Sequence, residues 1–190
     1  MGTEENPEGG GAPVGVKDMP MIQFYSQLGP RGQEMIKYLK KYDFQEKKDN
    51  KYPTKAIQHL VKVLLDPTLR DHHHIVLQGM SYIVKHLGPD CVEFLPVIIP
   101  PLMILIKTND ADLILDLYQC VNSIIISVPR DVNKFADIVF ETINEVMFTQ
   151  ALPVLELIKL LNVNCKDSLV TDMYLLLPKV LQLIEYKRGQ

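Results

Sequence analysis

The sequence predicts an all-α fold, an α-solenoid of about three and a half stacked helix pairs. Apolar residues recur at helical spacing through most of the chain, and no stretch alternates with the two-residue period of strands. The proline-bearing block at 94–106 also has a fainter copy at 174–184, in which Pro178 matches Pro100 at an offset of 78 residues, or two steps of 39. Because a period of about 40 to 47 residues with two helices per unit is typical of HEAT and armadillo arrays, we expect HEAT-type pairs.

The chain divides into three parts by composition. Residues 1–20 hold five of the ten glycines and three prolines, which predicts a flexible tail. Residues 21–50 are expected to form an amphipathic helix at 33–44 and a polar linker, and residues 51–190 the HEAT-repeat array. The helix is predicted from four apolar residues at helical spacing: Met35, Ile36, Leu39 and Tyr42.

The first predicted pair of the array is bounded by proline and glycine. Pro53 suits the first turn of a helix, where its missing N–H costs nothing, and Asp66-Pro67 ends that helix. Gly88-Pro89 closes the second helix, which we expect over 69–87. The predicted inward faces are Ala56, Ile57, Leu60, Val61 and Leu64 in the first helix, and Ile75, Val76, Met80, Ile83, Val84 and Leu87 in the second.

Two further pairs and a single helix complete the predicted array. We expect pairs at 91–107 with 111–128 and at 132–147 with 150–161, and a last helix at 169–186. No predicted helix covers the apolar side chains of this last one, whereas solenoid ends normally carry a polar cap, so we expect self-association through it. The uncovered residues are Leu175, Leu176, Val180, Leu183 and Ile184.

Two local signals concern the second pair. Pro96, Pro100 and Pro101 remove backbone donors from a helix, so a kink is expected around Pro100. The short polar side chains of Thr108-Asn109-Asp110 are expected to cap the helix that follows.

Composition limits the functional classes. The net charge of -3 and the pI near 5.9 argue against a general nucleic-acid binder, although residues 37–62 carry +5 and the remainder -8. Three separated cysteines without a CxxC pair favour reduced thiols in a cytosolic or nuclear compartment, and we expect a cytoplasmic protein. No signal-peptide pattern is present, and the longest apolar run is shorter than the roughly 18 to 20 residues that span a bilayer, so no transmembrane segment is predicted.

The His72-His73-His74 triplet is a candidate for metal binding, since imidazole is a common metal ligand. Consecutive helix residues point about 100° apart, however, so the three rings share no face. A capping or packing role at the helix start is the favoured interpretation.

The acidic side chains of Asp110, Asp112 and Asp116 could form a carboxylate cluster. Acid near a helix N-terminus more simply complements the helix dipole, and this is the favoured interpretation. Because no spacing of a catalytic triad and no glycine-rich phosphate loop occurs, we predict no enzyme activity, cofactor or metal for this chain.

A basic surface is predicted near the start of the chain. The lysine-rich stretch, with Tyr38, Tyr42 and Tyr52, could contact nucleic acid or an anionic membrane, but its interspersed acids favour a solvated helix face. We therefore expect protein partners, with an acidic surface opposite these cations, and no nucleic acid. The predicted partner contacts are Arg31, Lys37, Lys40, Lys41, His72, His73 and His74.

Several motifs of the array occur together in one known family. They are a Tyr-Pro helix start at 52–53, a Leu-Asp turn with the histidine triplet at 65–74, Leu-Gly-Pro-Asp-Cys-Val at 87–92, Phe-Leu-Pro at 94–96 and Ile-Pro at 99–100. This set resembles the central HEAT segment of the target of rapamycin kinases, which are phosphatidylinositol-3-kinase-related Ser/Thr kinases.

The resemblance is specific over 51–106, fades into general HEAT character up to 184 and does not extend to 1–50. It implies a piece of α-solenoid far from the kinase domain, in repeats that carry partner subunits and help to form the dimer of the whole kinase. The Lys and Asp signatures of phosphoryl transfer are absent from this chain.

Two functional hypotheses follow. The first is a non-catalytic scaffold segment of a target-of-rapamycin-like kinase, which contacts kinase-complex subunits or the rest of the same kinase in nutrient and growth signalling. The alternative is a free-standing HEAT-repeat adaptor or regulatory protein with no kinase attached, which the compact length and the start at Met1 favour.

Overall fold

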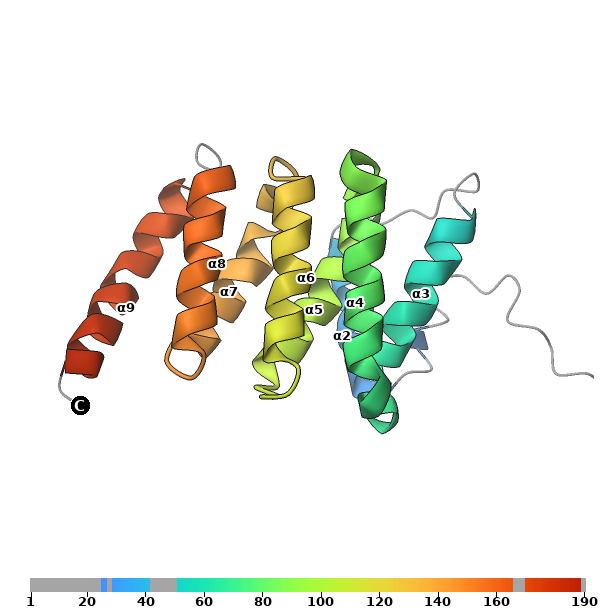
Figure 1. Cartoon of the computed structure of the whole chain (residues 1–190), viewed down its shortest axis with the longest axis horizontal. Coiled ribbons are helices and arrows are strands. Elements are labelled where there is room, and N and C mark those ends of the chain that lie inside the picture. The colour runs from blue at the N-terminus through green and yellow to red at the C-terminus, as the bar shows by residue number, and fades with distance from the viewer. Residues whose placement is uncertain (1–24, 27–28, 42–50, 166–169, 189–190) are drawn as a thin grey trace, which may run out of the picture.

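The computed structural model describes residues 25–26, 29–41, 51–165 and 170–188, and it shows helices stacked in pairs (Figure 1). No strand occurs in these ranges, so the predicted all-α solenoid is confirmed. The pairs are α3 (Lys51–Leu65) with α4 (Arg70–Leu87), α5 (Leu95–Lys107) with α6 (Ile114–Ser127), and α7 (Ala136–Val146) with α8 (Ala151–Asn164), followed by α9 (Val170–Arg188). Short 3-10 segments adjoin them: η2 (Pro67–Leu69), η3 (Gly88–Phe94) and η4 (Val132–Phe135).

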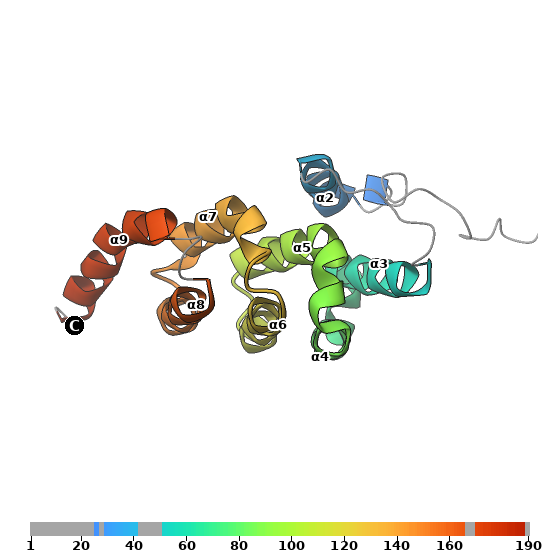
Figure 2. The same cartoon turned by 90° about the horizontal axis from the view of Figure 1, so that it is seen from above.

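The pairs form two layers, and one more helix, α2 (Gly29–Lys41), lies outside them (Figure 2). Helices α4, α6 and α8 pack side by side in one layer, and α3, α5, α7 and α9 form the other. Helix α2 packs on α5 from the side opposite to α6. The prolines of the two repeated blocks, Pro100 and Pro178, thus lie in α5 and α9, two pairs apart in one layer.

The helix predicted at 33–44 begins four residues earlier, as α2, and its predicted last three residues lie outside the described part of the chain. Its expected apolar residues Met35, Ile36 and Leu39 are buried. Tyr42, the linker and the flexible tail predicted for 1–20 lie outside the described residues.

The buried face of α3 is only partly the predicted one. It consists of Thr54, Ile57, Gln58, Val61, Leu64 and Leu65. Ala56 is exposed, so its predicted inward position is wrong. Helix α3 has neighbours in both layers, α4 and α5, so the buried face extends to the polar residues Thr54 and Gln58. A stripe of apolar residues in the sequence does not predict the burial of polar ones.

Helix α4 shows the same displacement of its buried face. Ile75, predicted to point inward, is 67% exposed, whereas Leu77 is fully buried. The face that packs against α3 and α6 includes the polar His73 and Ser81, and these shifted the predicted apolar stripe to one side. The complete buried face is His73, Val76, Leu77, Met80, Ser81 and Val84.

Helix α5 is apolar and buried on all its faces. Every residue from Leu95 to Ile106 except Pro96 is buried, because α3 and α7 flank α5 in its own layer, α6 lies beneath it and α2 lies above it. Pro96 stands in the first turn, where a missing donor costs nothing, while Pro100 and Pro101 lie inside the helix, which continues through them. The bend around Pro100 stays a prediction.

Two other local predictions are corrected by the structure. Helix α6 begins at Ile114 without a side-chain cap; the carboxylate of Asp110 instead accepts a hydrogen bond from the backbone N–H of Asp112, 3.2 Å away in the preceding turn. In α9, Leu176 and Leu183 are buried because α7 and α8 pack on that side, so these two residues do not lack cover.

One apolar helical run stands out in the described residues. The stretch Pro67–Lys107 contains a window long and apolar enough to cross a membrane by length and composition alone, and 72% of this window is buried inside the fold. Such burial is what a core helix shows, so the run is weak evidence for a membrane span.

Candidate interaction site

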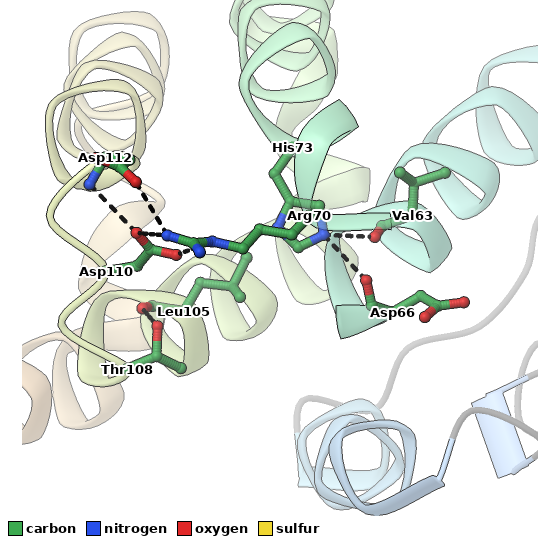
Figure 3. Close-up of polar contacts among 8 residues, drawn as sticks. All are labelled: Val63, Asp66, Arg70, His73, Leu105, Thr108, Asp110 and Asp112. Carbon is green, nitrogen blue, oxygen red and sulfur yellow. Dashed lines mark hydrogen bonds and ion pairs between the residues drawn. The ribbon is translucent and has the colours of Figure 1, made fainter. Parts of the chain in front are cut away.

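The turns inside the helix pairs lie along one edge of the array and are joined by polar contacts. Arg70, at the start of α4, reaches the turn between α5 and α6 (Figure 3). Its Nε and Nη2 donate to the two carboxylate oxygens of Asp110, each at 2.8 Å, and Nη2 also donates to Asp112 at 3.0 Å. This fork links the first pair to the second with two parallel hydrogen bonds, the strongest geometry that an exposed ion pair can take.

The contact shifts the titration of both partners. The hydrogen bond from Arg70 lowers the pKa of the Asp110 carboxyl, and its burial opposes the shift. The same hydrogen bond raises the pKa of the Arg70 guanidinium. Asp110 and Asp112 therefore bind Arg70 of a neighbouring helix. The predicted interaction with the helix dipole did not include this role.

His73 fills the gap where α3 ends and α4 begins. Its ring is 2% exposed, and Nε2 lies 2.9 Å from the carbonyl oxygen of Val63 and 3.1 Å from that of Asp66 (Figure 3). Since both neighbours are acceptors, Nε2 carries the proton and donates to carbonyls at the end of α3 and in the turn that follows it. Of the two predicted roles, packing is confirmed for His73, whereas the start of α4 has no side-chain cap. The burial of His73 leaves no ring surface for a partner.

The other two histidines of the triplet have separate environments. His72 is exposed. His74 Nδ1 lies 2.5 Å from an oxygen of Asp116 on α6, and its Nε2 lies 3.0 Å from the side-chain amide of Gln78. The triplet therefore does not converge on one point, and no group of three or more metal-ligating side chains occurs in the part of the chain that the structure describes.

A buried amide, which the sequence did not point to, joins the second pair to the third. Gln150, 3% exposed, precedes α8 and accepts a hydrogen bond from the Tyr118 hydroxyl at 2.9 Å. Its Nε2 donates to the carbonyl oxygen of Ile106 at 2.8 Å and to Asn109 Oδ1 at 3.0 Å. Gln150 and Arg70 thus both make polar contacts between pairs along the edge formed by the turns. In the sequence, Gln150 is marked only as a single amide before an apolar helix.

The predicted cations of α2 do not form one free surface. Lys37 and Lys40 are exposed and Arg31 is half-buried, but Lys41 makes an ion pair with Asp137 on α7. One side of α2 borders an open hollow of about 570 Å³. The residues that line it are Pro30, Gln33, Glu34, Lys37, Tyr38 and Lys41.

A second lysine joins α5 to α7 beside α2. Lys107 Nζ lies 2.8 Å from Glu141 and 3.0 Å from Glu145, and its side chain is largely covered. Burial alone would lower the pKa of Lys107, but the hydrogen bonds to the two glutamates raise it above its ordinary value. Burial mainly raises the pKa of Tyr38 on α2, and the charge of Glu34 raises it further.

The three thiols are buried. Burial raises the pKa of Cys91 and of Cys120 to about 11, so both are protonated at neutral pH. The Cys165 thiol donates to the carbonyl oxygen of Pro129 at 3.2 Å. The polar contacts described in this subsection thus mainly join one helix to another.

Comparison with known proteins gives this array a family. The family described as "Serine/threonine-protein kinase mTOR domain" matches residues 20–128. The match begins at residue 20, so the expectation that the resemblance excludes residues 1–50 is wrong for 20–50, and α2 belongs to the matched region.

Curated relatives agree with the family match. The serine/threonine-protein kinase TOR2 of Saccharomyces cerevisiae is 31% identical over 97 residues, which cover 51% of this chain and 4% of the yeast protein. The serine/threonine-protein kinase mTor of Drosophila melanogaster is 32% identical over the same shares of each chain. The serine/threonine-protein kinase TOR of Arabidopsis thaliana is 27% identical over 143 residues, 70% of this chain and 6% of the plant protein. No solved structure matches.

Proposed function

Because this chain belongs to the family of the serine/threonine-protein kinase mTOR domain, we propose that it is a non-catalytic helical-repeat scaffold segment of a target-of-rapamycin-like kinase. In this proposal the chain contacts kinase-complex subunits or other parts of the same kinase, in cytoplasmic nutrient and growth signalling. The chain spans only 4% to 6% of the length of the relatives named above, so phosphoryl transfer is assigned to other parts of such proteins.

The proposal rests on the polar side chains of the matched region, which bind to neighbouring helices. Arg70, His73 and Asp110 all bind groups of neighbouring helices, which holds the pairs in a fixed stack. A fixed stack of helix pairs with an extended outer surface is the arrangement by which solenoids hold partners.

The layer of α4, α6 and α8 offers such a surface. Leu115 and Ile126 of α6 recur 37 residues later as Leu152 and Val163 of α8, and all four side chains are exposed. Equivalent positions of two neighbouring helices are therefore apolar and open to solvent, which is typical of a protein-binding face.

An antibody raised against the purified 190-residue chain tests the proposal in extracts of the source cells. We expect it to detect a polypeptide many times larger than 21.7 kDa and to precipitate Ser/Thr kinase activity from the cytoplasmic fraction. Antibody preincubated with the purified chain is the control and should precipitate neither. A single 21.7 kDa polypeptide without kinase activity would contradict the kinase segment and support the free-standing adaptor.

A further inference from the structure

The outer face of α5 is an apolar surface that needs a cover. Neighbouring pairs cover the other sides of α5, and among the described helices α2 lies over the side opposite to α6. Helix α2 packs on α5 and buries three large apolar side chains: Met35, Ile36 and Leu39. Their spacing of i, i+1 and i+4 is that of an amphipathic helix laid on a flat apolar face.

An acidic side of α7 borders this apolar face. Asp137, Glu141 and Glu145 are each four residues apart and so lie on one side of the helix. Lys41 of α2 pairs with Asp137, and Lys107 of α5 is shared between the two glutamates. Three carboxylates thus face two lysines, which leaves the border of the apolar face acidic and complementary to a basic helix.

Helix α2 packs mainly on one helix, α5, whereas the other helices of the matched region each pack against at least two. Gly32 lies in its first turn, and glycine is about 1 kcal/mol less favourable than alanine inside a helix. Its ion pair with α7 is solvent-exposed, where such pairs contribute little. Elements with few buried apolar side chains open at lower free energy than the core, so α2 can leave while the pairs stay folded.

We propose that the outer face of α5 and the acidic side of α7 form a docking surface for basic amphipathic helices, which α2 occupies in this chain and a partner's helix of the same chemistry occupies in its place. The partner helix carries apolar residues at i, i+1 and i+4 and a lysine at i+6, as α2 does at 35, 36, 39 and 41. This names the partner chemistry of the scaffold role proposed above. The docking surface itself does not depend on a kinase being attached.

The probe is a fluorescein-labelled synthetic peptide with the sequence of residues 29–41, added to the full 190-residue chain. A resident helix tethered in the same chain competes at an effective concentration of the order of mM, so the intact chain should bind the probe weakly. In the full chain carrying Leu39→Asp, α2 is released, and fluorescence anisotropy should show at least about tenfold tighter binding of the same probe. A probe that itself carries Leu39→Asp is the matched control and should not bind.

The acidic border is tested in the Leu39→Asp chain by adding Asp137→Lys and Glu141→Lys. Both substitutions should weaken probe binding, and 500 mM NaCl should weaken it in the parent, because exposed charges are screened at high salt. Absence of binding to a Leu39→Asp chain whose helix pairs still unfold cooperatively in urea overturns the proposal. Binding unaffected by the lysine substitutions overturns the acidic part.

If Leu39→Asp prevents folding, a protease site placed between residues 42 and 50 of the otherwise unchanged chain replaces it. After cleavage the α2 fragment should remain bound in gel filtration and exchange with the labelled probe. Failure of the probe to exchange overturns the proposal. Neither outcome bears on whether the chain is part of a large kinase, which the antibody experiment decides.

Discussion

Arg70 in the first helix pair holds both carboxylate oxygens of Asp110 in the second, with Nε–Oδ2 and Nη2–Oδ1 distances of 2.8 Å. The hydrogen bond from Arg70 lowers the pKa of the Asp110 carboxyl. A carboxyl with a depressed folded-state pKa stabilises the fold above its unfolded pKa of about 3.9, and this contribution is lost as the pH falls through the folded value. Asp110→Asn should therefore lower the free energy of unfolding at pH 7, and the difference from wild type should shrink below about pH 4.

Urea unfolding followed by circular dichroism between pH 7 and pH 3 checks this prediction. Asp112→Asn is the matched control, because Asp112 is largely exposed and receives a single contact from Arg70. Its effect should be smaller at every pH. A loss in Asp110→Asn that is independent of pH would show that the ion pair is not its cause.

Removing the buried amide of Gln150 should destabilise the junction between the second and third pairs. Gln150→Leu leaves the buried Tyr118 hydroxyl without its acceptor and removes the side-chain donor to the Ile106 carbonyl, which keeps the backbone N–H of Asn109, and this costs about 1–3 kcal/mol of unfolding free energy. Tyr118→Phe removes only one hydrogen bond and should cost about 0.5–1.5 kcal/mol. In a double-mutant cycle measured by urea unfolding the two losses should not add; full additivity would mean that the two side chains act independently.

His73→Ala should cost about 1–3 kcal/mol of unfolding free energy, because it removes the imidazole hydrogen bond to the carbonyl oxygens of Val63 and Asp66, which keep only their backbone donors, and opens a gap beside them. Its neighbour His72 is exposed, so His72→Ala should change stability by less than about 0.5 kcal/mol. Thermal unfolding of the two variants under one buffer condition gives the comparison. Equal losses would contradict this role of the His73 ring.

The thiols should be unreactive in the folded chain. Cys91 and Cys120 are fully buried with raised pKa values, and Cys165 is buried and hydrogen-bonded. Ellman's reagent at pH 8 should therefore show no fast phase with the native protein and three thiols in denaturant. A fast native phase would mean that one of the junctions between pairs opens readily.

Self-association is expected through the exposed side of α9. Leu175, Leu177 and Leu181 remain open to solvent there, although Leu176 and Leu183 are covered. Light scattering should show a mass that rises with concentration, and the double variant Leu177→Gln, Leu181→Gln should restore the monomer. A wild-type chain that stays monomeric at high concentration contradicts this prediction.

The order of the helices follows from the sequence because their ends are marked locally. Pro53, Asp66-Pro67 and Gly88-Pro89 act on the backbone of their own turn, so no knowledge of distant segments is needed. The 78-residue offset between the two proline blocks, or two steps of 39, likewise agrees with the place of α5 and α9 two pairs apart in one layer.

The buried faces of the helices and the contacts between pairs are harder to predict from the sequence than the order of the helices. Each helix has neighbours on several sides, so polar residues such as His73 and Gln58 lie on the buried face and the most apolar stripe is not the most covered one. Arg70 meets Asp110 across 40 residues, and only superposing the repeats would have placed them together. The position of α2 had one signal, the uninterrupted apolar character of α5, which requires a cover on every side.

That all-round cover has a consequence for how the chain can vary. Amphipathic helices tolerate substitution on one face and reject it on the other, so their variability rises and falls with the helical turn. Between Leu95 and Ile106 we expect no such periodic variability, because another helix packs against every side of α5. Related chains should differ there through paired, volume-conserving exchanges with α2, α3, α6 or α7, and polar replacements should be rare throughout.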